Sequence, residues 1–122
     1  QSGKIIVSGG LHPGQSTNAT AALICEKIKA ARFLNATDVD GIYDFDPKKN
    51  TKAKMFKEIT IKKCLDLLNN ESTQAGNYEL MDIVAMKVIE RSKIPTYVIK
   101  SDPKIIRNLI MKNTQTGTKI TV

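Results

Sequence analysis

Four of the chain's seven aspartates fall within nine residues: Asp38, Asp40, Asp44 and Asp46. Carboxylates at this density could bind a divalent cation or hold sugar hydroxyls, or they could form polar turns. An EF-hand calcium loop needs oxygen ligands at positions 1, 3 and 5, glycine at 6 and glutamate at 12. Counted from Asp38, position 5 is Ile42, position 6 is Tyr43 and position 12 is Lys49. The spacing therefore excludes an EF-hand.

The aspartate-rich stretch also has the composition of an ordinary surface loop, because Asp, Gly and Asp-Pro favour turns. Within it, we expect a structural role for Asp40 and Gly41, with Asp40 capping the turn and Gly41 at positive φ. Tyr43 could stack on a base or line a pocket. Both interpretations of the stretch remain open on these residues alone.

A second candidate site is the glycine-rich stretch "GGLHPGQST", residues 9–17. Glycines let backbone N–H groups approach an anion, and a helix that begins near Ser16 and Thr17 points its positive end at the same place. The stretch is neither a GK[ST] phosphate loop nor a GxGxxG dinucleotide motif. A plain tight turn remains open, and His12, the only histidine, could simply be exposed to solvent.

The elements that would position these stretches follow from the spacing of apolar residues. The run at residues 4–8 predicts a buried strand, and residues 32–37 predict a second strand. Between them a helix through residues 18–31 should bury Ala21, Leu23, Ile24 and Ile28. The order strand, loop, helix, strand predicts a βαβ unit with parallel strands.

The same pattern continues to the end of the chain. Strands are expected at residues 54–59 and 95–100, with a closing strand at 116–122 near a sheet edge. Helices are expected at 61–70, 83–92 and 104–111, after the N-cap residues Thr60, Asp82 and Asp102. The apolar face of the second of these helices comprises Ile83, Met86 and Ile89.

This alternation of strands and helices predicts an α/β fold with helices on both faces of a mostly parallel sheet. Ligands bind such sheets at the carboxyl ends of the strands. Both candidate stretches are therefore expected at one edge of the sheet.

Composition limits the classes of protein. The chain has 122 residues, which predicts a single domain over 1–122, and its formal net charge is +7. Its lysines are scattered and no aromatic RNA-binding motif accompanies them, so we expect a solvated basic surface or a site for phosphate-bearing small molecules rather than for nucleic acid. No apolar run reaches membrane-spanning length and no signal peptide is recognisable. Cys25 and Cys64 are expected to be buried, reduced thiols of a cytoplasmic protein.

Three stretches, in this order and spacing, carry a resemblance: "GGLHPGQSTNATAAL", "ATDVDGIYDFDPKK" and "QAGNYELMDIVAMKVIERSKI". Together they resemble the C-terminal half of the archaeal-type uridylate (UMP) kinases, a branch of the amino-acid kinase family. The resemblance implies a three-layer αβα sandwich around a mostly parallel sheet, of which this chain is only the C-terminal, nucleotide-binding portion. It also implies transfer of a phosphoryl group from ATP, accompanied by Mg²⁺, to UMP, and a homo-oligomer, a hexamer in the family.

The resemblance also implies site residues. The UMP loop would comprise Leu11, His12, Pro13, Gly14, Gln15, Ser16 and Thr17. The ATP contacts would be Thr37, Asp38, Tyr43 and Asp46. Asp82 would organise the phosphate site as a candidate catalytic residue, although a helix N-cap explains it equally well. No side chain is implied as a ligand of a bound metal.

Three departures from the family pattern bear on activity. Position 38 is Asp where many relatives have Asn, and position 18 is Asn where many have Asp. The N-terminal half of the family, with its phosphate-binding lysine and glycine loop, is not part of this sequence. We therefore expect little or no kinase turnover from these 122 residues alone. Another phosphotransferase of the family, or a non-catalytic module that binds nucleotide or RNA, remains the alternative.

Overall fold

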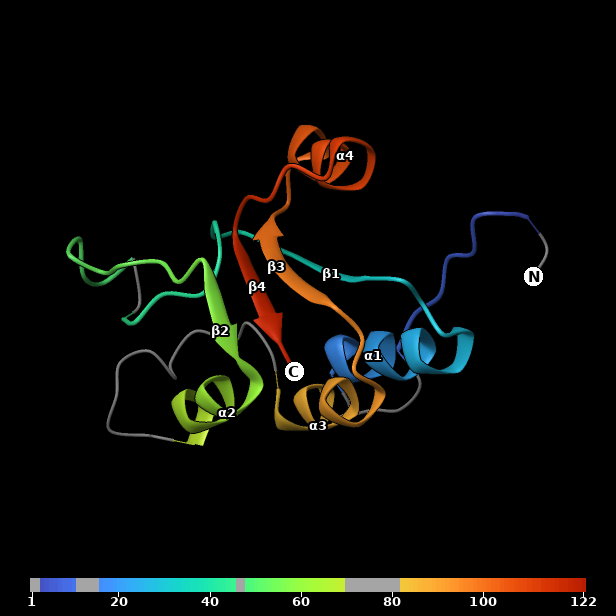
Figure 1. Ribbon diagram of the computed structural model, residues 1–122, viewed down its shortest axis with the longest axis horizontal. Helices are drawn as coiled ribbons and strands as arrows, with labels where there is room; N and C mark the ends of the chain where they lie inside the picture. Colours follow the sequence, from blue (N-terminus) through green and yellow to red (C-terminus); the bar gives the residue numbers. More distant parts are fainter. Residues whose placement is uncertain (1–2, 11–15, 46–47, 70–81) are drawn as a thin grey trace.

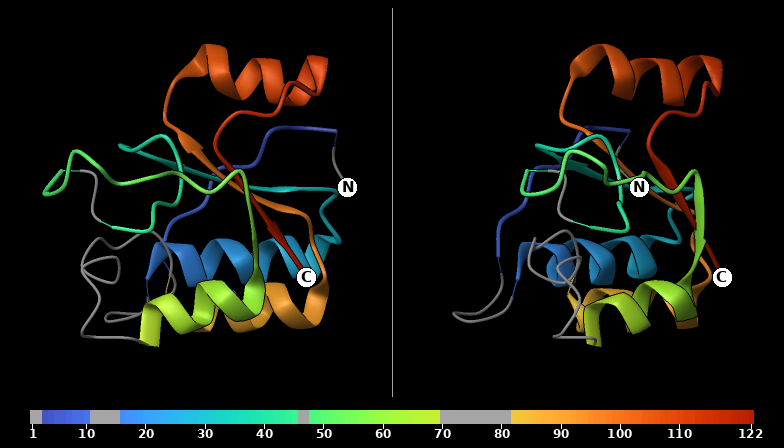
Figure 2. Two further views of the ribbon diagram at one scale, coloured as in Figure 1. Left: turned by 60° about the vertical axis from the view of Figure 1, so that its left-hand side comes forward. Right: turned by 90° about the vertical axis from the view of Figure 1, so that its left-hand side faces the viewer.

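The computed structural model describes residues 3–10, 16–45, 48–69 and 82–122. A four-stranded sheet separates helices α1, α2 and α3 on one face from helix α4 on the other (Figures 1 and 2). In chain order the elements are α1 Thr17–Ile28, β1 Phe33–Thr37, β2 Glu58–Thr60, α2 Ile61–Asn69, α3 Ile83–Ser92, β3 Thr96–Lys100, α4 Pro103–Lys112 and β4 Thr118–Thr121. The predicted α/β class with helices on both faces is confirmed.

The strand order is β1-β3-β4-β2. β1 pairs with β3 and β2 pairs with β4 in parallel, whereas β3 and β4 are antiparallel. The closing strand was expected near an edge, and that prediction is wrong, because β4 lies between β3 and β2. Its Thr118 and Ile120 are almost completely buried, which suits an interior strand covered by helices.

β3 joins the two halves of the core. Its alternate side chains point to opposite faces of the sheet. Val98 belongs to the larger cluster, which also contains Met86 and Ile89 of α3. Tyr97 and Ile99 belong to the smaller cluster with Leu109 of α4. The unbroken apolar run "YVI" therefore reflects a strand that is buried on both faces.

The helix predictions were mostly confirmed at their N-termini. Thr60 accepts a hydrogen bond from the Lys63 amide at the start of α2, at 3.2 Å. Asp82 caps α3, and Asp102 caps α4 immediately before Pro103. The strand predicted at residues 54–59 is shorter than expected, because only Glu58–Thr60 pairs within the sheet.

The apolar faces of α1 and α3 were predicted less well. α1 buries Ala19, Thr20 and Ala22, whereas Ile24 and Ile28 are exposed. α1 packs side by side with α3, and small residues let two helices approach closely. In α3 Met86 and Ile89 are buried as predicted, but Ile83 is about half exposed.

The strand predicted at residues 4–8 does not form. These residues have no regular secondary structure, and Ile5 and Val7 are 96% and 91% exposed. A strand needs a neighbour for its backbone hydrogen bonds, and within the described ranges β1 pairs with β3 but with no second strand. The apolar composition was therefore not sufficient to form a strand here.

Both cysteines are free, as expected. Burial raises the pKa of the Cys64 thiol to about 12 and also raises the pKa of the half-buried Cys25. Within the described ranges, no helix combines the length and apolarity needed to cross a membrane.

Gly117 provides a test of the packing at the start of β4. Its φ is +79°, and a Cβ atom there would lie 2.3 Å from the carbonyl oxygen of Val98. We expect Gly117→Ala to lower the free energy of unfolding by about 2–3 kcal/mol, measured by urea denaturation. Gly9→Ala is the control, since a Cβ there meets no atom within 4 Å. Equal stability of the two variants would contradict this packing.

Candidate functional site

Two helix N-termini that are far apart in sequence meet through their caps. The Ser16 hydroxyl donates a hydrogen bond to Oδ2 of Asp82. The same hydroxyl oxygen accepts from the Ala19 amide at 3.0 Å, and Oδ1 of Asp82 accepts from the Ala85 amide at 2.7 Å. Each cap therefore holds its own helix, and together they hold α1 against α3.

The other ends of the two helices are joined as well. The Arg91 guanidinium donates to both carboxylate oxygens of Glu26, at 2.7 and 2.6 Å. This bidentate pair lowers the pKa of Glu26, chiefly through the hydrogen bonds, and raises that of Arg91. Since the caps meet at one end and the ion pair forms at the other, α1 and α3 run parallel, and their positive ends lie side by side.

This arrangement suits an anion. The N-terminal ends of two parallel helices favour a phosphate or carboxylate group, and exposed Thr17 contributes a hydroxyl there, whereas the Ser16 hydroxyl already donates to Asp82. The predicted role of Asp82 as an N-cap is confirmed. Its additional contact with Ser16 links the end of the predicted UMP loop to a different helix. Of that loop, Leu11, His12, Pro13, Gly14 and Gln15 lie outside the described residues.

The aspartate-rich stretch pairs with the segment after it and forms a hairpin-like arm, of which residues 38–45 and 48–57 are described. The Asp44 amide donates to the Lys54 carbonyl at 3.0 Å, and the Phe56 amide donates to the Ile42 carbonyl at 2.8 Å. Tyr43 forms an isolated antiparallel bridge with Met55. The arm extends from the same side of the molecule toward which α1 and α3 point their N-termini (Figures 1 and 2).

The predicted ATP contacts occupy different parts of this arm. Thr37 ends β1, and its hydroxyl bonds the amide and carbonyl of Val39 in a tight turn. Asp38 is exposed and pairs with Lys48 at 2.5 Å. This hydrogen bond is the main cause that lowers the pKa of Asp38, with a smaller contribution from the charge of Lys100. Asp46 lies outside the described residues.

Tyr43 is held by Asp40. Partial burial raises the pKa of the Tyr43 hydroxyl, and the charge and hydrogen bond of Asp40 raise it further. The phenol of Tyr43 is therefore neutral at physiological pH. The predicted role of Asp40 as a turn cap stays a prediction, and its contact with Tyr43 was not expected.

The predicted positive φ at Gly41 is wrong, since Gly3 and Gly117 are the described glycines with positive φ. Gly41 is needed for space instead. A Cβ there would lie 2.7 Å from Oγ1 of Thr118 and 2.9 Å from Sδ of Met55.

Sequence reasoning missed Thr118. This residue is completely buried, accepts from the Ile42 amide at 2.9 Å and donates to the Phe56 carbonyl at 2.5 Å. It therefore joins both strands of the arm to the sheet. A threonine directly after Gly117, at the start of the predicted closing strand, was the available signal.

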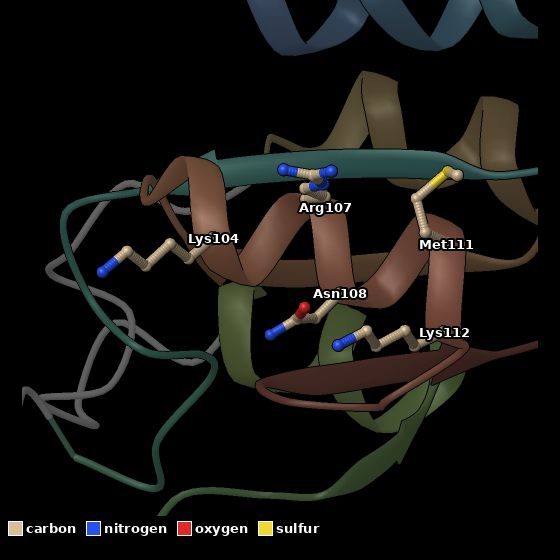
Figure 3. A pocket seen from close by; sticks show the side chains of 5 residues that line it. All are labelled: Lys104, Arg107, Asn108, Met111 and Lys112. Carbon is tan, nitrogen blue, oxygen red and sulfur yellow. The ribbon is translucent and has the colours of Figure 1, made fainter.

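The exposed face of α4 is basic and shallowly hollowed, over about 530 Å³. Lys104, Arg107, Asn108, Met111 and Lys112 line it at helical spacing, and Figure 3 shows them along one helix. Because a single helix forms it, this face matches the solvated basic surface expected from the composition.

Within the ranges that the structure describes, no three His, Cys, Asp or Glu side chains come together in a way that could hold a metal ion.

The chain is similar in sequence to a known protein family and to individual proteins. The sequence profile of the amino acid kinase family matches residues 1–100. The uridylate kinase of Archaeoglobus fulgidus is 43% identical over 117 residues, which are 96% of this chain and 53% of that protein. The uridylate kinase of Methanococcus aeolicus is also 43% identical, with 96% and 52% covered.

Solved structures with a similar fold also include uridylate and UMP kinases. The crystal structure of the Archaeoglobus fulgidus uridylate kinase superposes with a TM-score of 0.79 at 42% identity, over 93% of this chain and 50% of that one. The UMP kinase of Ureaplasma parvum gives 0.72 at 25% identity, over 90% and 43%. The chain thus spans about half the length of the curated relatives that it matches.

The contact between Ser16 and Asp82 can be measured by a double-mutant cycle. Ser16→Ala and Asp82→Ala should each lower the free energy of unfolding by about 1–2 kcal/mol, because each removes an N-cap. Since the two caps bond each other, we expect a coupling energy of at least about 0.5 kcal/mol. Asp102→Ala removes the cap of α4 on the opposite face, and its combination with Ser16→Ala should be additive. Additivity of the Ser16 and Asp82 changes would refute the contact.

Proposed function

This chain belongs to the amino acid kinase family, and from that premise we propose that it supplies the ATP site and part of the UMP site of a UMP kinase. The enzyme would transfer the γ-phosphoryl group of ATP to UMP, giving UDP for pyrimidine nucleotide synthesis. The observation that carries the proposal is the contact of Ser16 with Asp82. It joins two of the three stretches that resemble UMP kinases at a place suited to an anion.

In this proposal the residues of the chain bind the two nucleotides and orient them. The N-termini of α1 and α3 would hold the phosphate of UMP, with the hydroxyl of Thr17 adding a hydrogen bond. The Ser16 hydroxyl, whose proton goes to Asp82, would act by holding the two helix starts together. Asp82 would keep Ser16 in position. Thr37, Asp38, Tyr43 and Asp46 would contact ATP, with Tyr43 stacking on the base or lining its pocket.

Mg²⁺ would accompany ATP, where it neutralises charge on the phosphates. The described residues fit this role better than that of a resident metal site, because their exposed carboxylates are dispersed along the arm. Exposed Asp38 is the described carboxylate of the proposed ATP set that could face the cation, directly or through water.

Phosphoryl transfer also needs cationic groups on the transferred phosphoryl. We propose that these come from the part of the relatives that this chain does not cover, in the same polypeptide or in a partner. The complete enzyme would be cytoplasmic and a homo-oligomer, with a hexamer expected from the family.

Enzyme turnover tests the proposal directly. The 122-residue chain alone should give little or no UDP from ATP and UMP. Joined to the uncovered N-terminal portion of the Archaeoglobus fulgidus relative, it should form UDP and prefer UMP to aspartate or carbamate as acceptor. Robust UDP formation by the chain alone, or preference for another acceptor, would count against the proposal.

The role of Tyr43 can be tested by binding of ATP. Tyr43→Ala should weaken ATP binding about tenfold, because a stacked base is lost, whereas Tyr43→Phe keeps the ring, loses only the hydrogen bond to Asp40 and should have an intermediate affinity. Phe45→Ala, on the same arm, is the matched control. Isothermal titration calorimetry gives the affinities, and unchanged affinity in Tyr43→Ala would argue against the assignment.

A non-catalytic module for RNA is the alternative, and the basic face of α4 favours it. Such a module would bind RNA with an affinity that falls steeply with salt. It would also be indifferent to Tyr43→Ala, since Tyr43 lies on the arm and not on α4.

A further inference from the structure

A second hollow lies where the arm, the end of β3 and the loop before β4 meet. Its volume is about 360 Å³, within the range of small-molecule sites. The lining comes from four separate segments, including Asp40, Met55, Lys100, Ile105 and Gly117. It includes a residue of α4 and none of α1 or α3, so it is distinct from the place where Ser16 meets Asp82.

Apolar, positively charged and negatively charged side chains line this hollow together. Met55 and Ile105 contribute apolar surface, while Lys57 and Lys100 place two exposed cations at the rim. Asp40 adds one carboxylate. Apolar surface suits the face of a base, lysines suit phosphate groups, and a carboxylate accepts hydrogen bonds from an amine or a ribose hydroxyl.

The walls of the hollow are fixed by the fold. Gly117 packs so closely that a Cβ would lie 2.9 Å from the Asp40 carbonyl oxygen. The Gln115 side-chain amide donates to the Lys57 carbonyl at 3.2 Å. Buried Thr118 ties both strands of the arm to β4. A ligand would thus meet a backbone wall that is already held in place, and its binding would order the exposed side chains, among them the two lysines.

We propose that this hollow binds a nucleoside phosphate and that its occupancy regulates the nucleotide site at Tyr43. The regulatory part rests on the proposed function. Two of the residues that line the hollow also hold Tyr43: Asp40 bonds its hydroxyl, and Met55 pairs with its backbone. A ligand that engages either residue changes the support of Tyr43.

Lys100 provides a second connection between the hollow and the predicted ATP contacts. Its positive charge reaches Asp38, where it contributes to lowering the pKa of that carboxyl. A phosphate bound to Lys100 would offset this charge and weaken its effect on Asp38. The hollow and the predicted ATP contacts are therefore linked both by contacts and by charge.

Methyl and amide NMR on the 122-residue chain tests the inference. The Ile105 δ1-methyl reports on the hollow, and the Thr37 amide reports on the predicted ATP contacts. Titration with ATP should shift the Ile105 signal saturably, whereas inorganic triphosphate should bind there at least about tenfold more weakly, since it offers no base. Lys57→Ala and Lys100→Ala should each weaken the ATP response at Ile105 about tenfold.

Lys62→Ala, which removes an exposed lysine from α2, is the control for net charge and should leave the response unchanged. No shift of Ile105 with ATP, an equal response to inorganic triphosphate, or an equal loss in Lys62→Ala would overturn the inference. The proposed function has separate readouts. A response at Ile105 without one at Thr37 supports binding in the hollow, but it overturns the proposed link to the nucleotide site and counts against the proposed ATP site. A response at Thr37 alone supports that site and overturns the hollow.

Discussion

The double-sided burial of β3 is the constraint on which the rest of the structure depends. Val98 and Ile99 are fully buried on opposite faces of the sheet, so helices must cover both faces. β3 also lies between β1 and β4, and its register fixes where the carboxyl end of β1 and the start of β4 lie. The arm, the loop before β4 and the N-terminus of α4 therefore meet at one end of this strand. Both the hollow and the predicted ATP contacts result from that meeting.

On one face, the parallel packing of α1 and α3 brings two capped N-termini together. The caps alone would stabilise each helix separately. Their mutual contact adds a constraint between residues 66 positions apart in the chain. The Glu26–Arg91 pair holds the other end of the two helices, so their relative direction is fixed at both ends. This geometry turns two ordinary helix starts into one place suited to a phosphate group.

Much of the candidate site could be predicted from local signals. Thr60, Asp82 and Asp102 were recognisable as N-caps because capping chemistry is local, and Asp102-Pro103 marks a helix start without reference to the rest of the chain. The strands β1 and β3 were recognisable from their apolar runs. The position of β4 was not, because chain order does not determine strand order in a sheet. The segment at residues 4–8 failed for a related reason, since an apolar run does not supply the neighbour that a strand requires.

The sequence by itself determined the α/β class, the helix starts and the resemblance to UMP kinases, because each depends on neighbouring residues or on short motifs. The tertiary structure alone decided that Ser16 bonds Asp82 and that Asp40 and Met55 hold Tyr43. It also decided that Gly41 is required for space rather than for its φ angle. These contacts join residues from separate segments. Their geometry depends on how the helices and strands pack, and no local pattern records that packing.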